Sequence, residues 1–415
     1  MEWYLGLDLD QNEIQISMMR IEDREPESVA QEKDSGRFRI PTCLAQKITS
    51  GVWCFGEEAA MHAKDPDYIF LDDLYERAIL GQKIMVGEER IDAGMAFGLF
   101  LQKVVQMLVQ RHRNMEIVQV TIAVRKITPA ILGFMEIIPS YLKLPAEAVH
   151  LRDYKECFYH YALSGDAMLH SHDVLLFDYT GHDLKCMHLT VDKRKQPLLA
   201  IIHEETFENF DFTVFGKPMT SEEKDEEFVH ILKEVLAGKV ISAVYLVGEG
   251  FAGEWMEEST RLLCQNRRVF VGQNLYTKGA AWSMINPIVG DWPYVYLGDE
   301  KTKANLAIMI RDGRKDKLYT LVSAGENWYE TSGDADVILT EGEILPIVLK
   351  APDGSATKME ELPLTGLPLR PPKTTRLHVE ARPEAQDVIR VKITDLGFGA
   401  LTPGSGLTWE YRVTI

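Results

Sequence analysis

The sequence predicts an α/β region made of two similar halves, followed by a separate all-β domain. Two apolar segments far apart in the chain each end in an aspartate, Leu5-Gly6-Leu7-Asp8 near the start and Val174-Leu175-Leu176-Phe177-Asp178 in the middle. Beyond about Pro287 the helical periods vanish, and residues 301–415 become short alternating runs broken by Asp-Gly, Pro-Pro and glycine-rich turns. Each apolar segment can form a buried strand that delivers its carboxylate to one side of a shared cleft.

The first half reads as a hairpin set, a helix, a strand and a second helix. Residues 4–18 alternate in polarity and continue into residues 40–45, which indicates antiparallel strands with Asp8 at the first turn. Apolar residues then recur on one helical face between Phe97 and Leu108, and they lead into an apolar strand at residues 118–124. A helix closes this half over residues 157–163, with Gly165 as its C-cap.

The second half repeats this order. It opens with the strand at Val174, crosses a polar helix around residues 222–236, and reaches a buried strand at residues 243–247. That strand runs into the turn Gly248-Glu249-Gly250. The repetition predicts that the two halves share one fold.

The composition excludes several classes of partner and site. A chain of 415 residues has material for two or three domains, and its formal net charge of −18 argues against nucleic acid, whose binding depends on clustered Lys and Arg. Five cysteines without a C-x-x-C pair indicate neither a disulfide framework nor a zinc knuckle, and we expect them to be reduced and buried. The sequence shows no signal peptide and no membrane span, so we expect a cytoplasmic protein with no membrane partner.

Six short motifs follow one another along the chain in an informative order. They are Leu5-Gly6-Leu7-Asp8-Leu9-Asp10, Ile40-Pro41-Thr42, Val52-Trp53-Cys54-Phe55-Gly56-Glu57-Glu58-Ala59, Phe177-Asp178-Tyr179-Thr180-Gly181-His182-Asp183, Tyr245-Leu246-Val247-Gly248-Glu249-Gly250 and Gly279-Ala280-Ala281. This order resembles that of the DnaK-type heat-shock chaperones, a branch of the actin-like ATPase superfamily. The C-terminal part, from residues 364–371 through 389–395 to 412–415, is similar to the end of that family's β-rich substrate-binding domain.

The resemblance implies a two-lobed actin-like (ribonuclease H-like) ATPase fold followed by an all-β sandwich. Lobe I would span residues 1–168, lobe II residues 169–290, and the sandwich residues 301–415. Between Met187 and Ser242 the chain has room for a strand or two and one helix, where the family places a whole extra subdomain. We therefore expect a reduced outer subdomain in lobe II. The sequence ends where the family's helical lid would begin, which implies a lidless architecture.

The phosphate-binding turns of the family are altered in this chain. The first turn is rich in glycine and threonine in the family, so that backbone N–H groups can approach phosphate oxygens. Here that turn is Asp10-Gln11-Asn12. In the second turn, Asp178 is followed by a segment that retains only Gly181 of the family's glycines.

The same turns place additional carboxylates where the family binds nucleotide. The adenosine turn keeps Gly248 and Gly250 but has Glu249 between them. The carboxylates of Asp10, Asp183 and Glu249 would thus face a polyanionic ligand. One like-charge contact at about 4 Å costs about 4 kcal/mol at an effective dielectric constant of about 20, so we expect ATP binding to be weak or absent.

Other residues that match the family are compatible with ATP hydrolysis. Asp8 and Asp178 match the family's metal-facing aspartates, and with Asp10 and Asp183 nearby they could hold a hard cation such as magnesium through waters. Asp153 aligns with the family's water-activating glutamate and would be the catalytic residue. The alternative for Asp8, Asp178 and Asp153 is structural, because aspartates at the ends of buried strands often cap the next turn or helix.

The β-rich domain suggests a different class of function. In the family it binds extended peptides through backbone hydrogen bonds and an apolar pocket. The corresponding region here carries Trp328, Tyr329, Val337, Ile338 and Leu339 as peptide-binding candidates. The alternative is that these residues form the core of the sandwich, since its strands must alternate inward and outward.

These features together predict a degenerate DnaK-like protein that acts as a protein-interaction or scaffold module, with its ATPase activity lost or weak. The expected partner is a protein or peptide, and ATP with magnesium is the cofactor pair that the resemblance implies if any is bound. The alternative is an active metal-dependent ATPase with atypical phosphate loops and a peptide-binding arm. A small-molecule kinase of the same superfamily, with Asp153 as base, is disfavoured because such kinases do not carry this β domain.

Overall fold

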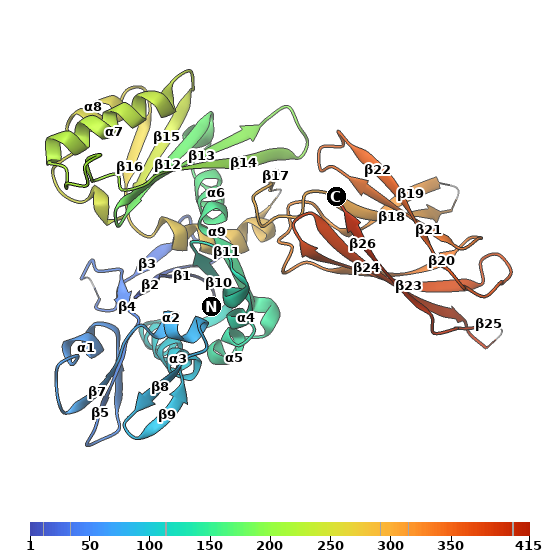
Figure 1. Cartoon of the computed structure of the whole chain (residues 1–415), viewed down its shortest axis with the longest axis horizontal. Coiled ribbons are helices and arrows are strands. Elements are labelled where there is room, and N and C mark those ends of the chain that lie inside the picture. Colours follow the sequence, from blue (N-terminus) through green and yellow to red (C-terminus); the bar gives the residue numbers. More distant parts are fainter. Residues whose placement is uncertain (11, 34, 113, 291, 314, 401) are drawn as a thin grey trace. The chain divides into compact units, whose positions relative to one another are not determined.

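The chain forms two compact units, which Figure 1 shows in a computed structural model that describes residues 1–10, 12–33, 35–112, 114–290, 292–313, 315–400 and 402–415. Unit 1 comprises Met1–Thr190 and Ile202–Trp292, and unit 2 comprises Val191–Ile201 and Pro293–Ile415. Unit 1 is mixed α/β, and the described residues of unit 2 contain strands and no helix. The expected α/β region followed by a β-rich region is thus confirmed. The predicted lobe I lies in unit 1, as do residues 169–190 and 202–290 of the predicted lobe II. Residues 191–201 of that lobe belong instead to unit 2, together with residues 293–300 and the predicted domain at 301–415.

The first sheet of unit 1 is built around its first strand. Strand β1 runs antiparallel to β2 on one side and parallel to β10 on the other, and β10 is in turn parallel to β11. Strands β3 and β4 both pair antiparallel with β2. The strands are β1 (Glu2–Leu9), β2 (Glu13–Met19), β3 (Glu27–Val29), β4 (Ile40–Pro41), β10 (Glu116–Val124) and β11 (Val149–Asp153).

The second sheet has the same strand order. Strand β12 runs antiparallel to β13 on one side and parallel to β15 on the other, and β15 is parallel to β16. The order β16-β15-β12-β13-β14 therefore repeats the order β11-β10-β1-β2-β3, and β17 extends the second sheet beyond β14. The strands are β12 (Asp173–Thr180), β13 (Asp183–Asp192), β14 (Leu198–Phe207), β15 (Ile241–Val247), β16 (Arg268–Val271) and β17 (Tyr294–Tyr296). The two halves of the α/β region share one topology, as the sequence predicted.

Two helices hold the halves together, and Figure 1 shows them between the two sheets. Helix α6 (Tyr154–Ser164) follows the last strand of the first half, and α9 (Leu275–Val289) follows the last strand of the second. Their backbones touch, because a Cβ atom added at Gly279 would lie 1.9 Å from the carbonyl oxygen of Cys157. Helix α9 also rests directly on β1, since a Cβ atom at Gly6 would lie 1.9 Å from the carbonyl oxygen of Thr277.

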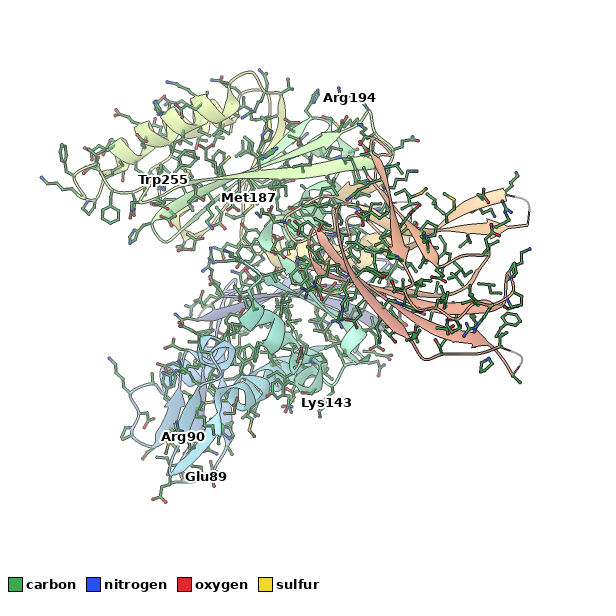
Figure 2. All side chains as sticks on the ribbon, turned by 45° about the vertical axis from the view of Figure 1, so that its right-hand side comes forward. Glu89, Arg90, Lys143, Met187, Arg194 and Trp255 are labelled. Atoms are coloured by element: carbon green, nitrogen blue, oxygen red, sulfur yellow. The ribbon has the colours of Figure 1, made fainter. Side chains whose placement is uncertain are left out.

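The remaining elements of the first half cover its sheet or project from it. Helix α3 is the one helix of the described residues that is long and apolar enough to cross a membrane, and 56% of its apolar window is buried inside the protein. Glu89 and Arg90 lie at the tip of the β8–β9 hairpin, as Figure 2 shows. The elements are β5 (Leu44–Lys47), β6 (Trp53–Phe55), α1 (Gly56–Met61), β7 (Tyr68–Leu71), α2 (Leu74–Ile79), β8 (Lys83–Val86), β9 (Glu89–Asp92), α3 (Ala93–Arg111), α4 (Pro129–Met135), α5 (Ile138–Leu142) and the 3-10 turns η1 (Ala146–Ala148) and η2 (Ala167–His170).

The second half carries few elements besides its sheet. Helix α7 (Ser221–Leu236), the 3-10 turn η3 (Glu249–Phe251) and helix α8 (Glu258–Leu263) complete it. Phe177, Phe228 and Trp255 belong to its apolar core, and Figure 2 marks Trp255 beneath α7. The expectation that all cysteines are buried was wrong for two of them, because Cys54 is half-buried and Cys264 is exposed.

Unit 2 consists mainly of two antiparallel sheets that share one apolar core. Leu306 and Leu349 of the first sheet belong to the same buried cluster as Val379 and Ile393 of the second. The first sheet has the order β19-β18-β21-β22, and the second has the order β20-β23-β24-β25, with β26 also pairing with β24. Their strands are β18 (Asn305–Asp312), β19 (Lys315–Val322), β20 (Gly333–Leu339), β21 (Ile344–Lys350), β22 (Thr357–Pro363), β23 (Thr375–Ala385), β24 (Val388–Phe398), β25 (Thr402–Pro403) and β26 (Thr408–Thr414).

The contact between α6 and α9 predicts the effect of a single methyl group. Gly279→Ala places a Cβ atom against the carbonyl of Cys157, which is backbone and cannot turn aside. We expect the free energy of unfolding to fall by about 3 kcal/mol, as for an overpacked core. The matched control is Gly133→Ala in α4, where nothing lies within 4 Å of the added atom and helix propensity favours alanine. Urea unfolding measures both, and equal stabilities for the two variants would contradict the backbone contact.

Candidate functional site

Two buried aspartates meet in one cleft of unit 1. Asp8 lies near the end of β1 and Asp178 near the end of β12, the central strands of the two sheets. Their exposed fractions are 6% and 3%, and both line the same small cavity. The structure therefore brings together the two carboxylates that the sequence singled out.

A tyrosine donates a hydrogen bond to each aspartate. The Oη of Tyr154 lies 2.6 Å from Oδ1 of Asp8, and the Oη of Tyr276 lies 2.7 Å from Oδ2 of Asp178. Tyr154 is the first residue of α6 and Tyr276 the second residue of α9, so equivalent helices supply them. The two rings stack with centroids 3.8 Å apart and planes 10° apart. Thr180 donates a further hydrogen bond to Asp178 over 2.6 Å.

Burial keeps Asp8 and both tyrosines protonated to higher pH than usual. Burial raises the pKa of Asp8 to about 7, against the hydrogen bond from Tyr154, which lowers it, and with the charge of Asp10, which raises it. Burial and the nearby carboxylates also raise the pKa of Tyr154 and of Tyr276 well above the usual value. Both phenols therefore remain hydrogen-bond donors at neutral pH.

The carboxylate of Asp10 has a cationic partner. Nη2 of Arg125, which directly follows β10, lies 2.9 Å from Oδ2 of Asp10. The Cζ of Arg125 also lies 5.4 Å from the centre of the Tyr154 ring. Asp10 lines the cleft, and its charge is paired there within the protein.

Glu249 also has internal partners. Its Oε2 lies 3.6 Å from Nη2 of Arg39, and its Oε1 accepts a hydrogen bond of 2.8 Å from the backbone N–H of Gly181. This N–H is thus occupied by a carboxylate of the same chain. Gln11, which was predicted as a nucleotide-binding residue, lies outside the described residues.

The glycines of the turn Gly248-Glu249-Gly250 are required by packing. Gly248 has a φ of +102°, and a Cβ atom there would lie 2.2 Å from the carbonyl oxygen of Tyr179. A Cβ atom at Gly250 would lie 2.2 Å from the ring of Tyr179. These contacts explain both glycines without a ligand, although Gly248 also lines the cleft.

Two predicted aspartates lie apart from the cleft. The Oδ1 of Asp183 accepts a hydrogen bond of 3.0 Å from the backbone N–H of Asn209. Asp183 is not among the described residues that line the cleft. The expectation that Asp183 would face a ligand there was wrong. Asp153 is buried, and its Oδ1 accepts a hydrogen bond of 2.7 Å from the backbone N–H of Glu156. It is the N-cap of α6, which is the capping role that the sequence allowed as the alternative to a catalytic one.

The cleft is nearly full of side chains. Its volume is about 40 Å³, which is little more than the space of one water molecule. Pockets for small ligands usually hold about 300–1,000 Å³. Within the described ranges no group of three or more His, Cys, Asp or Glu side chains is placed to hold a metal ion. As it stands, the cleft has room for neither a nucleotide nor a large hydrated cation.

The five peptide-binding candidates do not form one surface. Val337 and Leu339 pack against the buried core of unit 2, whereas Ile338 between them is 51% exposed. The Nε1 of Trp328 donates a hydrogen bond to Glu300 over 2.9 Å, and its ring meets that of Tyr329 edge-on at 5.5 Å. For Val337 and Leu339 the core alternative is the correct one.

Sequence reasoning missed the residues that close the cleft. Tyr154, Tyr276, Arg39 and Arg125 all line it, and none was singled out. Arg125 could have been found, because it follows a parallel strand at the carboxyl edge of its sheet, where α/β proteins place functional side chains. The two tyrosines gave no such signal, since their pairing depends on how α6 and α9 cross.

The fold and the cleft define a mixed α/β protein with an internally repeated sheet, followed by a β-rich unit. The model for the C-terminal part of a family of unknown function, DUF5716, matches residues 25–299, and the chain belongs to that family. A model for a domain of unknown function, DUF8552, matches residues 301–415. No curated protein matches the chain. Neither family description states an activity, so the function must be argued from the cleft.

The raised pKa of Asp8 predicts a pH-dependent stability. The native state retains the proton between the ordinary aspartate pKa and about 7, whereas the unfolded state has lost it, so stability falls as pH rises through this range. Asp8→Asn removes the ionisation, so its stability should not fall in this way. Between about pH 5 and about pH 8 the free energy of unfolding of the variant should therefore rise relative to that of the wild type, by an amount on the order of 3 kcal/mol. Urea unfolding at both pH values measures it. Asp183→Asn, outside the cleft, is the control, and parallel profiles for all three proteins would contradict the burial of the Asp8 charge.

Proposed function

We propose that the chain is a degenerate DnaK-like protein of the actin-like ATPase superfamily and works as a protein-interaction or scaffold module without nucleotide hydrolysis. The repeated strand order supports the fold assignment. In each half a central strand has a hairpin partner on one side and two parallel strands on the other, and the helix after the last strand packs at the junction of the halves. Residues 1–168 and 169–290 would be the two lobes.

The observation that carries the proposal is the filled cleft. In such a fold the nucleotide would lie between the ends of the two central strands, beside Asp8 and Asp178. Here the stacked rings of Tyr154 and Tyr276 lie beside those aspartates and leave about 40 Å³. An ATP molecule would have to displace both rings and break both hydrogen bonds before it could bind.

The charges of the cleft support the same proposal. The N–H of Gly181, which would serve a phosphate, already binds the carboxylate of Glu249. Arg125 is paired with Asp10 in the same way. Because these donors are satisfied within the chain, phosphate would gain little free energy by replacing their partners.

A protein partner is supported by an exposed loop in the second half. Between β14 and α7 the chain forms a short loop that is closed by the hydrogen bonds Thr213 N–H to Lys217 O and Gly216 N–H to Thr213 O, each 2.8 Å. At its tip Val214 and Phe215 are 95% and 88% exposed. Two neighbouring apolar side chains held out of the core by an ordered turn suit burial against another protein. The loop and α7 stand where the resemblance expects the extra subdomain, which fits a reduced outer subdomain.

One observation favours the second candidate, an active ATPase. Arg39 and Arg125 both line the cleft and could contact phosphate oxygens if their carboxylate partners moved aside. That candidate requires the cleft to open and a metal ion to enter beside Asp8 and Asp178. The test below separates it from the proposal.

The full chain should bind MgATP with a Kd weaker than about 1 mM. If the stacked rings are the obstacle, the double variant Tyr154→Ala/Tyr276→Ala should gain at least about tenfold in affinity, or about 1.4 kcal/mol. The double variant Tyr154→Phe/Tyr276→Phe keeps both rings and should show no gain. Isothermal titration calorimetry measures all three proteins, with near-ultraviolet circular dichroism to confirm that each is folded.

Two outcomes of this experiment would count against parts of the proposal. Micromolar binding of MgATP by the unaltered chain would favour the active ATPase. Unchanged affinity in the alanine variant would assign the loss of binding to the reduced outer subdomain instead of the rings.

Partner binding should depend on the exposed loop and not on the cleft. In an extract of the cells that naturally produce the protein, the double variant Val214→Ser/Phe215→Ser should cross-link to far fewer partner proteins than the unaltered chain does. Asp8→Asn should cross-link to the same partners as the unaltered chain. Met168→Ser, which removes another apolar side chain with 70% exposure, is the matched surface control. Loss of partners in Asp8→Asn but not in the loop variant would favour a cleft-dependent switch.

A further inference from the structure

Three arginines stand in one row across the second sheet of unit 2. Arg382 on β23 is directly opposite Arg390 on β24, and Arg390 is directly opposite Arg412 on β26. Their sequence neighbours Ala381, Val391 and Val413 are buried, so the three arginines project from the outer face of the sheet. Residues directly opposite one another on one face have Cβ atoms about 5 Å apart, and like charges at this spacing are destabilising.

The row has too few carboxylates to balance it. Glu384 serves two of the arginines, with Oε1 lying 3.5 Å from Nε of Arg390 and Oε2 lying 2.9 Å from Nε of Arg412. In the part of the chain that the structure describes, the guanidinium of Arg382 has neither an ion pair nor a hydrogen bond. Two of the three cationic side chains therefore share one carboxylate, and the third has none among the described residues.

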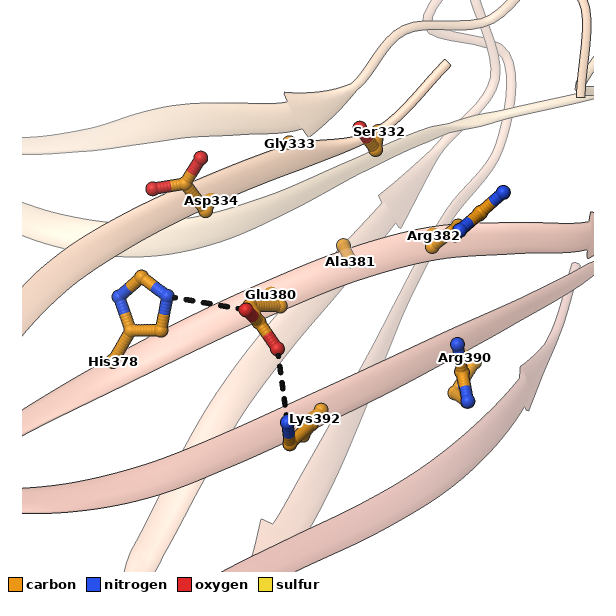
Figure 3. Close-up of a pocket in the computed structure, with 9 residues that line it drawn as sticks. All are labelled: Ser332, Gly333, Asp334, His378, Glu380, Ala381, Arg382, Arg390 and Lys392. Atoms are coloured by element: carbon orange, nitrogen blue, oxygen red, sulfur yellow. Dashed lines mark ion pairs between the residues drawn. The ribbon is translucent and has the colours of Figure 1, made fainter. Parts of the chain in front are cut away.

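A hollow with a volume of about 450 Å³ lies over this end of the sheet. Arg382 and Arg390 line it together with Lys392, and Ser332, which directly precedes β20, lines it as well. Figure 3 shows Arg382 and Arg390 projecting from neighbouring strands at one end of the hollow. The volume lies within the range of about 300–1,000 Å³ that small-ligand pockets occupy.

The acidic side chains of the hollow lie toward its other end, where Figure 3 shows Asp334 and His378. Glu380 is paired there with Nε2 of His378 and with Nζ of Lys392, each at 3.5 Å. Nδ1 of His378 is paired with Asp336 over 2.8 Å. The arginine end therefore keeps a net positive charge.

The charge of the surrounding residues does not oppose an anion. Residues 301–415 contain 15 Lys and Arg and 16 Asp and Glu, a net charge of −1 out of the −18 of the whole chain. A local excess of positive charge is thus placed on a stretch of chain that is otherwise nearly neutral. Such a row attracts anions at short range.

We propose that the arginine end of this hollow is a binding site for a small molecule that carries a phosphate dianion. Each guanidinium presents a planar fork of N–H donors that matches phosphate bidentately, and a phosphate monoester offers two charges and three free oxygens to two such forks. A single carboxylate has two oxygens and one charge, so it can serve only one fork well. A bound dianion would also relieve the repulsion between Arg382 and Arg390. This site is independent of the cleft and of the function proposed above.

The test is titration of the full chain with inorganic phosphate at constant ionic strength, followed by calorimetry. The expected Kd is in the millimolar range or tighter, and Arg382→Gln and Arg390→Gln should each weaken it at least about tenfold. Arg376→Gln is the matched control, because Arg376 is an exposed residue of β23 outside the hollow and its loss changes the net charge equally. Citrate at the same ionic strength is the comparison for carboxylates.

A second readout follows from the repulsion within the row. Without added anion, Arg390→Gln should unfold at a temperature equal to or above that of the wild type. Phosphate should raise the unfolding temperature of the wild type more than that of Arg390→Gln. Absence of saturable binding up to about 10 mM phosphate would overturn the proposal. Equal losses in Arg376→Gln, or citrate binding as tightly as phosphate, would overturn the site or its ligand class. MgATP binding that survives Arg382→Gln belongs to the cleft, so the two proposals fail separately.

Discussion

The stack of Tyr154 and Tyr276 is the interaction on which the α/β region depends. Each ring belongs to the helix that closes one half, and each hydroxyl donates to the aspartate at the end of that half's central strand. The contact therefore ties four elements from both halves into one buried polar network. Burying a carboxylate costs several kcal/mol unless donors satisfy it, so each tyrosine stabilises the aspartate of its own half.

The same network explains why the cleft is closed. Two aromatic rings occupy the space between the strands, and the surrounding ions are arranged as pairs, Arg125 with Asp10 and Arg39 with Glu249. A ligand that enters such a site must break the buried hydrogen bonds to Asp8 and Asp178 and displace these partly exposed ion pairs. Its own contacts would then mainly replace those that it removed. A polar cleft is thus compatible with very weak ligand binding.

The sequence predicted the strands and the meeting of the aspartates more reliably than the chemistry of the cleft. Apolar periodicity located β1 and β12, and their shared ending placed Asp8 and Asp178 together. It could not show that Asp10 has a partner, because Arg125 lies 115 residues away and reaches it only through the parallel pairing of β1 with β10. For Asp153 the sequence allowed two roles, and the structure shows the helix cap.

The arginines of the two units show how ion pairing distinguishes a side chain that stabilises the fold from one whose charge is available to a ligand. Arg125 lies over an aromatic ring and holds a carboxylate, so its charge is used within the fold. Arg382 is exposed, faces another arginine across the sheet and is left without its own carboxylate among the described residues. Strand alternation alone predicts that Arg382 points outward, but only the register of β23, β24 and β26 aligns it with Arg390 and Arg412. Because repulsion within that row is a cost that folding does not remove, an anion has more to gain there than in the cleft, where Arg39 and Arg125 are already paired.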